Sequence, residues 1–229
     1  MGKINAKGSG VKGLKNTNFD CSHCGVMNCY RRAGDFPLAC TGGDVSEAQM
    51  ESLKRLYQDD PVVSKMALSA AEIEGTYYGR LTRVEEIVAF ARRIGAEKLG
   101  IATCVGLMNE TKTFVKILRA HELNSYCVIC KIGSIDKTEI GIKEDMKVNK
   151  GSFEAICNPI LQAKLLNKEK TDLNVIVGLC VGHDSLFIKY SKAPVTTLIT
   201  KDRVLGHNPA AALYTSEFYY KKLLNNQDI

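Results

Sequence analysis

The 229-residue sequence lacks the features that mark membrane and secreted proteins. It contains no run of about 18 apolar residues, so no ordinary transmembrane helix is expected. The N-terminal stretch has no apolar core of the kind found in secretory signals. We therefore expect a cytoplasmic protein without a membrane partner, in which residues 1–17, rich in Gly and Lys, form a flexible tail.

Signatures for nucleotides and nucleic acids are also missing. No glycine-rich dinucleotide fingerprint stands between a predicted strand and a helix, and no Walker motif occurs, so we expect no NAD, FAD or ATP. The formal charge of +6 counts every thiol as neutral, and binding of metal by thiolates would reduce it. Basic residues are scattered and no aromatic–basic RNA motif is present, which argues against a nucleic-acid partner. A small molecule or an electron-transfer protein remains as the expected partner.

Cysteine, by contrast, is abundant, with nine residues in the chain. Without a secretion signal a disulfide framework is not expected, because thiols stay reduced inside the cell. Cysteines in such a compartment more often bind metal or carry out thiol chemistry. The cysteines therefore become the main candidates for function.

The first group of cysteines has the spacing C-x2-C-x4-C-x10-C and lies in a loop over residues 18–43. Four thiolates on a short loop can surround one zinc ion or bind the corners of a [4Fe–4S] cluster. The spacing matches neither a common zinc ribbon nor a bacterial ferredoxin motif, so it leaves the metal open. The predicted metal ligands in this loop are Cys21, Cys24, Cys29 and Cys40.

The rest of the chain predicts a helical segment over 44–95 and an α/β domain over 96–229. Capping boxes and glycine stops predict helices at 46–58, 61–74 and 84–94. Apolar strands then alternate with helices, a pattern typical of a parallel sheet covered on both faces. We expect an open, three-layer sheet of about four strands. The predicted strands are 98–104, 125–130, 173–180 and 195–200, and the predicted helices are 109–122, 152–166, 184–191 and 208–214.

A second group of cysteines stands at the ends of these strands. Cys104, Cys130 and Cys180 each end a predicted strand, and Cys157 comes shortly before the third strand. In open α/β sheets, ligands bind beyond the carboxyl ends of the strands, where the chain changes direction. A strand order of 2-1-3-4 would place Cys104 and Cys180 on either side of that point. The four cysteines would then meet in one crevice.

The triplet Cys-Val-Gly occurs at two of these strand ends. Gly106 and Gly182 permit a tight turn and a close approach of the backbone to a bound group, so both are predicted to contact the cofactor. A cysteine at the start of the following helix is favoured as a thiolate. Taken singly, each cysteine could simply be an apolar residue that ends a strand. Together they favour a site, whereas Cys127, on the opposite face of its strand from Cys130, is expected in the core.

Polar residues follow the same strand ends and are candidates for acid–base chemistry. They are Lys131, His183, Asp184, Arg203 and His207. A histidine in such a place could donate a proton or bind the metal. A structural alternative is that Asp184 caps a helix and that His207 is a turn residue.

Several segments also resemble a family of uncharacterised proteins from anaerobic bacteria and archaea, described as a domain of unknown function or as "metal-binding protein". The resemblance is carried by AAEIEGTYYGRLTRVEEI, GIATCVGL, CKIG, CNPILQA, GLCVGHDSLFIKYSKAPVTTLITKDRVLGHNP and AALY. It covers nearly the whole chain after residue 18 and implies metal binding through cysteine, but no reaction. The matching cysteines are Cys21, Cys24, Cys29, Cys40, Cys104, Cys130, Cys157 and Cys180, which leaves out Cys127.

Three functions are compatible with these patterns. The first is an iron–sulfur protein with one or two [4Fe–4S] clusters, whose crevice cluster acts on a small molecule as an oxidoreductase or a lyase. If three cysteines bind that cluster, we expect Cys104, Cys157 and Cys180, which leaves one iron open as a Lewis acid. The second is a non-catalytic protein with structural zinc in the N-terminal loop and a crevice for metal storage, sensing or delivery. The third is a thiol oxidoreductase.

Overall fold

The computed structural model describes residues 20–31, 34–37, 40–43 and 45–225. The predicted tail, residues 1–17, lies outside these ranges. The chain divides into two compact units, Met1–Ser64 and Lys65–Ile229. Each unit is described by itself below.

The first unit holds the N-terminal cysteines and helix α2. A 3-10 helix covers Cys21–His23, and α1 (Asn28–Arg31) follows it. The predicted helix start at Ser46 is confirmed, because Ser46 and Gln49 form a capping box for α2 (Glu47–Asp59). Helix α3 (Pro61–Tyr77) begins with Pro at its first position and runs into the second unit.

The second unit is built on an open sheet of four parallel strands, so the predicted fold class is confirmed. The strand order is β2-β1-β3-β4, the order under which the cysteines were expected to meet in one crevice. The chain moves from β1 to one edge and then returns to place β3 on the other side of β1. The change of direction therefore lies between β1 and β3. The strands are β1 (Lys98–Thr103), β2 (Asn124–Ile129), β3 (Leu173–Val177) and β4 (Val195–Ile199).

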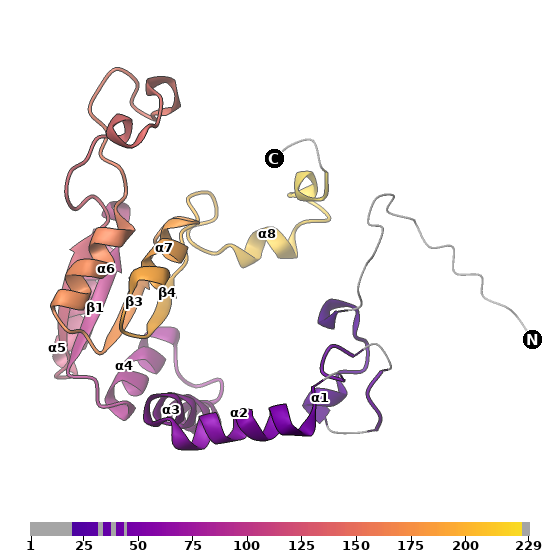
Figure 1. The fold of residues 1–229 in the computed structure, drawn as a ribbon. Coiled ribbons are helices and arrows are strands. Elements are labelled where there is room, and N and C mark those ends of the chain that lie inside the picture. The colour runs from indigo at the N-terminus through magenta and orange to yellow at the C-terminus, as the bar shows by residue number, and fades with distance from the viewer. Residues whose placement is uncertain (1–19, 32–33, 38–39, 44, 226–229) are drawn as a thin grey trace, which may run out of the picture. The chain divides into compact units, whose positions relative to one another are not determined.

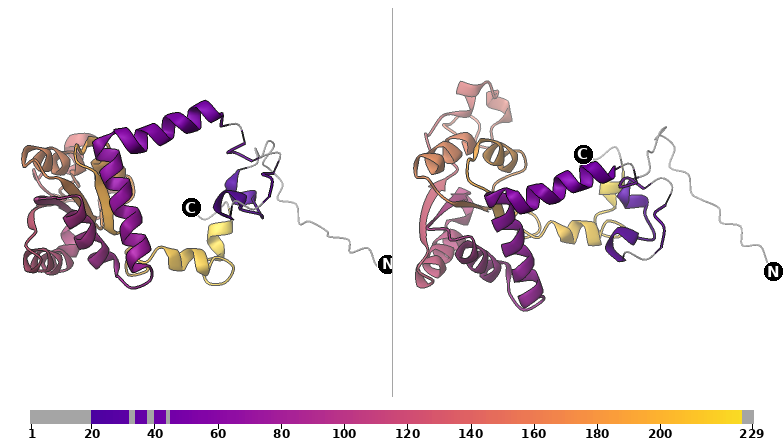
Figure 2. Two further views of the ribbon diagram at one scale, coloured as in Figure 1. Left: turned by 90° about the horizontal axis from the view of Figure 1, so that it is seen from below. Right: turned by 60° about the horizontal axis from the view of Figure 1, so that its bottom comes forward.

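Helices cover both faces of the sheet (Figures 1 and 2). Helix α5 packs on β1 and β2 from one face, where α4 contacts β4, while α6 and α7 pack on each other over the opposite face. Strands β1 and β3 are buried along nearly their whole length because they lie between these layers. The helices of this unit are α4 (Arg83–Arg93), α5 (Met108–Ala120), α6 (Pro159–Lys168), α7 (His183–Tyr190) and α8 (Ala210–Tyr214).

The connection between β2 and α6 differs from the expectation. A helix was predicted from Ser152, but α6 begins at Pro159, with Asn158 as its N-cap. The Asn158 side chain accepts a hydrogen bond from the Leu161 N–H at 3.0 Å. Pro159 disfavours helical geometry in the residue before it, so the helix starts at the proline. Cys157 therefore lies outside the helix, in the segment that leads into it.

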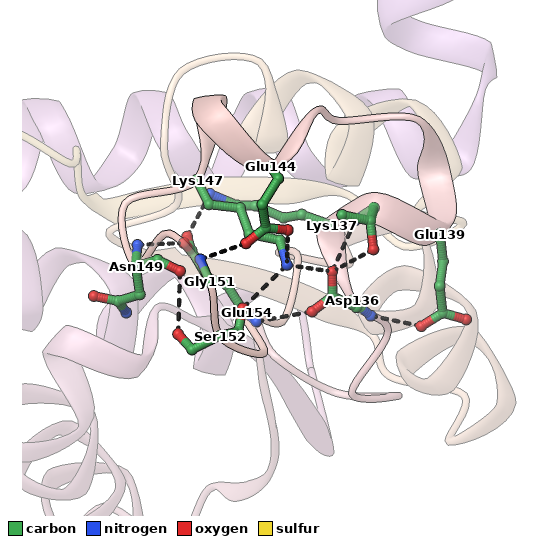
Figure 3. A network of polar contacts seen from close by, with 10 residues as sticks. Asp136, Lys137, Glu139, Glu144, Lys147, Asn149, Gly151, Ser152 and Glu154 are labelled. Carbon is green, nitrogen blue, oxygen red and sulfur yellow. Dashed lines mark hydrogen bonds and ion pairs between the residues drawn. The ribbon is translucent and has the colours of Figure 1, made fainter.

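The same connection carries a network of charged side chains (Figure 3). The buried Lys147 ammonium contacts Asp136 Oδ1 and Glu144 Oε2, both at 2.9 Å. Lys137 pairs with Glu154 in the same network. Two 3-10 helices, Lys137–Ile140 and Glu144–Met146, carry these charged groups. Polar contacts rather than an apolar core therefore stabilise the segment between β2 and α6.

Within the part of the chain that the structure describes, no helix combines the length and apolar character needed to cross a membrane.

Candidate functional site

Backbone hydrogen bonds bring three cysteine-bearing segments to one edge of the sheet. The Cys104 N–H donates to Val177 O at 3.0 Å, which joins the end of β1 to the end of β3. The Cys130 N–H donates to Thr103 O at 2.8 Å and joins β2 to β1. Asn158 N–H donates to Cys130 O at 2.7 Å, so the segment that carries Cys157 lies beside the end of β2. The predicted gathering of distant cysteines at the carboxyl ends of the strands is therefore observed.

The four cysteines line one small enclosed cavity at the change of strand direction. Cys104 and Cys130 come directly after β1 and β2, and both are buried. Cys180 is not the last residue of a strand, since β3 ends at Val177 and the chain turns at Gly178 before Cys180. The cavity has room for about one water-sized molecule. Its lining consists of Cys104, Cys130, Cys157, Gln162, Leu179, Cys180 and His183.

The thiols interact with one another through Cys130, which lies between Cys104 and Cys157. Hydrogen bonding with Cys130 lowers the pKa of Cys104 and of Cys157, and it raises the pKa of Cys130. The physical cause is shared: a thiolate is stabilised by a neighbouring S–H donor, and negative charges on either side disfavour a third.

Backbone N–H groups and three cations surround the sulfurs. The Val105 N–H donates to Cys130 Sγ at 3.3 Å, and the Gly106 N–H hydrogen-bonds to the Cys104 sulfur. Each of the other three cysteines has a cationic neighbour, and for Cys104 and Cys157 this neighbour helps to lower the pKa of the thiol. The pairs are Lys201 with Cys104, Lys131 with Cys157, and Arg203 with Cys180, where Arg203 Nη2 lies 3.0 Å from Cys180 Sγ.

The glycines of the two Cys-Val-Gly turns have different roles. Gly182 has a φ of +81° and is the N-cap of α7, so it uses the left-handed backbone region that favours glycine. Gly106 lies in a 3-10 turn, Val105–Leu107, without a positive φ. A Cβ on Gly106 would lie 3.4 Å from Lys201 Nζ and 4.0 Å from Cys104 Sγ. Gly106 therefore permits a close approach of the backbone to Lys201 and Cys104, whereas Gly182 permits the turn. Contact of either glycine with a cofactor stays a prediction.

Two buried polar atoms in the cavity lack a partner among the described residues. They are Gln162 Oε1 and His183 Nδ1. Buried polar groups in proteins are nearly always hydrogen-bonded, and an unsatisfied one costs about 1–3 kcal/mol. Both atoms belong to residues that line the cysteine cavity.

The other predicted polar residues have mixed positions. His183 lines the cavity, and Lys131 donates to Ala155 O at 2.6 Å beside Cys157. Asp184 Oδ1 accepts a hydrogen bond from the Ser185 N–H in the first turn of α7. His207 has a φ of +68°, and its Nδ1 accepts from the Asp202 N–H at 3.2 Å. His207 thus has the turn role that was considered as an alternative, whereas Asp184 lies within α7 and is not its cap, since the N-cap is Gly182. Neither Asp184 nor His207 lines the cavity.

The expectation for Cys127 was wrong. Cys127 was expected in the core, but its side chain is exposed on β2. Strand β2 is an edge strand, with a neighbour on one side only, and alternate residues along it are not covered equally. Cys127 takes no part in the cavity.

The N-terminal cysteines are not gathered in the same way. Cys21 and Cys29 are exposed, and Cys24 and Cys40 are partly exposed. Within the described ranges, no three Cys, His, Asp or Glu side chains are grouped so that they could hold one metal ion as they stand. This holds for the sheet edge too, where the sulfurs are engaged with one another and with cations. A metal centre there would replace those hydrogen bonds with bonds to metal.

Sequence reasoning missed Gln162 and Lys201. Gln162 belongs to the buried face of α6, with Pro159, Ala163 and Leu166. The helical period predicts an apolar residue at this position. The polar side chain found there was the signal that could have identified Gln162. Lys201 lies two residues after the end of β4, and its position beyond a strand end was the signal that could have identified it.

These features define a class of protein. It is a doubly wound α/β domain with four cysteines between β1 and β3, where the order of the strands in the sheet reverses. The chain belongs to the family described as "Protein of unknown function (DUF1847)", whose family model matches residues 40–198. It is similar to the "Uncharacterized protein MJ0455" of Methanocaldococcus jannaschii, with 47% identity over 207 residues, which cover 90% of this chain and 99% of that protein. The resemblance to an uncharacterised family is thereby confirmed. No solved structure matches the chain.

Proposed function

We propose that the protein is a cysteine-ligated metalloprotein of the cytoplasm and that Cys104, Cys130, Cys157 and Cys180 hold an iron–sulfur centre. The observation that carries the proposal is the convergence of these four cysteines, from four separate segments, on one enclosed cavity. Thiolate sulfur is the donor that iron–sulfur clusters require. In this reading, the centre serves redox or Lewis-acid chemistry on a small molecule.

The surroundings of the sulfurs support a ligand role. Two of the thiols have a lowered pKa, so the proton that metal binding must displace is already weakly held. The N–H groups of Val105 and Gly106 point at sulfur, and such donors tune a bound centre. When bound, a cluster supplies an electron acceptor or an open iron as a Lewis acid, and the protein's own groups orient the ligand and exclude water.

A non-catalytic zinc protein is the second candidate, and the size of the cavity favours it. Room for about one water-sized molecule suits a single ion better than a cluster, unless Cys180 moves outward from its partly exposed position. In this reading, the cavity stores, senses or delivers metal. A zinc or iron–sulfur centre on Cys21, Cys24, Cys29 and Cys40 is part of both candidates and is supported by their spacing alone.

Metal analysis of strictly anaerobic protein separates these functions. Brown protein with iron and acid-labile sulfide near stoichiometry supports the first candidate, and colourless protein with zinc alone supports the second. Metal-free protein whose thiols titrate with disulfide reagents would leave thiol oxidoreduction and refute both.

Two variants test the assignment of the ligands. Cys180→Ala should abolish metal at the sheet edge and leave the metal of the N-terminal loop in place. Cys127→Ala removes a thiol from the same domain but outside the cavity, so it should keep full metal content. Loss of all metal in Cys180→Ala, with the fold intact by circular dichroism, would mean one shared centre and would refute the two-site division.

A further inference from the structure

Gln162 is a fully buried amide whose two ends have different surroundings. Its Nε2 donates to Thr103 O at 3.2 Å and to Val128 O at 2.7 Å, at the ends of β1 and β2. These two carbonyl acceptors define which end of the amide is the nitrogen. Gln162 Oε1 is therefore held in a fixed orientation, and among the described residues no donor reaches it.

The residue with the free oxygen lines the cysteine cavity. Gln162 has no exposed surface, so bulk solvent does not satisfy Oε1. It lines the cavity together with His183, whose Nδ1 is the other unpartnered atom. An unsatisfied buried carbonyl costs about 1–3 kcal/mol, a cost that a bound donor removes.

Asn174 shows how the same fold treats a buried amide without a ligand. It is also fully buried, on β3. Its Oδ1 accepts from Thr171 Oγ1 at 2.7 Å, and its Nδ2 donates to Ser191 Oγ at 2.7 Å. Both ends of Asn174 thus have partners within the protein, so the free oxygen of Gln162 sets that residue apart.

We propose that Gln162 Oε1 binds a small molecule with an O–H or N–H donor, in the first instance water, and holds it against the metal centre. This inference rests on the proposed function. The amide oxygen can only accept a hydrogen bond, so the ligand class is a hydroxyl or amine donor. An acceptor-only ligand, such as a diatomic gas, would leave the oxygen unsatisfied.

The inference also narrows the chemistry of the centre. A cluster that only passes electrons needs no binding position for a solvent molecule. A buried acceptor built beside the sulfurs favours a centre that takes up a hydroxyl- or amine-bearing ligand, which is Lewis-acid chemistry. Gln162 is in this reading a binding residue that sets which ligands enter and how they are oriented.

Oxygen-17 water is the probe that tests this assignment. The iron-loaded protein is reduced in water enriched in oxygen-17, and its electron paramagnetic resonance signal is compared with that in ordinary water. We expect broadening of the signal by oxygen-17 in the native protein and loss of the broadening in Gln162→Leu. Iron and sulfide content should be equal in both. Asn174→Leu, which removes a buried amide away from the cavity, should keep the broadening.

Gln162→Glu is the second variant, for use if Gln162→Leu fails to fold. Its buried carboxyl keeps an acceptor oxygen, so the broadening of the resonance signal by oxygen-17 should persist. Iron-loaded native protein without broadening would overturn the inference and leave the proposed function standing. Broadening that survives in Gln162→Leu would overturn it as well. Native protein without iron and sulfide would instead refute the proposed function on which it rests.

Discussion

The backbone N–H of Val105, at the end of β1, donates a hydrogen bond to Cys130 Sγ, at the end of β2, over 3.3 Å. This contact joins the turn of one strand to the sulfur of its neighbour. It exists because the register sets Thr103 opposite Ile129, so the residues that follow meet beyond the sheet. A backbone donor aimed at sulfur stabilises negative charge there. The sheet edge is thus organised around sulfur even before any ligand is considered.

The central position of Cys130 predicts how the thiols of metal-free protein titrate. Cys130 lowers the pKa of Cys104 and Cys157 by hydrogen bonding, so the partly exposed Cys157 should react with iodoacetamide at neutral pH. In Cys130→Ala, the pKa of both thiols should rise towards the ordinary value and alkylation of Cys157 at pH 7 should slow several-fold. Mass spectrometry of the alkylated peptides over a pH series measures this. Cys127→Ala should leave both titrations unchanged, and an unshifted titration in Cys130→Ala would contradict the proposed hydrogen bonding.

The contact between Arg203 and Cys180 predicts a shift of the reduction potential. Reduction adds negative charge to the centre, and the guanidinium 3.0 Å from Cys180 Sγ favours the reduced state. Arg203→Gln should therefore make the potential more negative, by tens of millivolts, which corresponds to about 1 kcal/mol for a one-electron couple. Redox titration of the metal-loaded protein measures the shift. Arg119→Gln, at the exposed C-terminal end of α5, removes the same charge and should change nothing; an equal shift in both would show a general charge effect.

The fold was largely predictable because its signals are periodic and local. Capping boxes at Ser46 and Thr82 place helix starts, and both are observed. Buried strands that alternate with helices predict a parallel sheet, and the cysteines at the strand ends suggested the observed order. The misplaced start of α6 shows the limit: a proline fixes a helix start more strongly than a preceding serine.

The gathering of the four cysteines was predictable, but the other residues that line the cavity were not. Strand ends locate Cys104 and Cys130, because parallel strands end at one edge. The unpartnered oxygen of Gln162 depends on carbonyl groups of two other strands, and the pairing of Lys201 with Cys104 depends on the length of the turn after β4. Such contacts are set by tertiary packing, which local patterns do not encode. The prediction that Cys127 lies in the core failed for the same reason, because the order of the strands decides which strand lies at an edge of the sheet.

The charged network of the β2–α6 connection predicts a loss of local order in acid. The hydrogen bond from Lys147 lowers the pKa of Asp136 and of Glu144 below their ordinary values of 3.8 and 4.5. A lowered pKa means that the stabilisation is fully present above those values and is lost as the pH falls below them. The exchange protection of residues 136–154, which is the exchange rate of an unstructured peptide divided by that of the protein at the same pH, should therefore fall as the pH drops below about 4.5.

Lys147→Met supplies the matched comparison for that network. The variant keeps a long buried side chain but leaves both carboxylates without their cation, so exchange protection over 136–154 should be low at pH 7 and should change little with pH. Strands β1 and β3 should keep their protection in both proteins. Protection of the native segment that does not change in acid would show that the ion pairs do not stabilise it.

The turn after β3 predicts that Gly178 and Gly182 differ sharply in their tolerance of a side chain. Both have a positive φ, of +71° and +81°, so alanine is strained at either position. At Gly182 nothing lies within 4 Å of an added Cβ, and Gly182→Ala should cost about 1 kcal/mol of unfolding free energy. At Gly178 the added Cβ would lie 1.9 Å from Leu107 Cδ1, so the buried Leu107 must move, and Gly178→Ala should cost about 3 kcal/mol or more. Urea unfolding of the two variants measures the difference. Leu107 belongs to the turn that follows Cys104, so Gly178→Ala should also lower metal content at the sheet edge, and Gly182→Ala should lower it less. Equal destabilisation of both variants would mean that Leu107 does not pack against the turn at Gly178 as described.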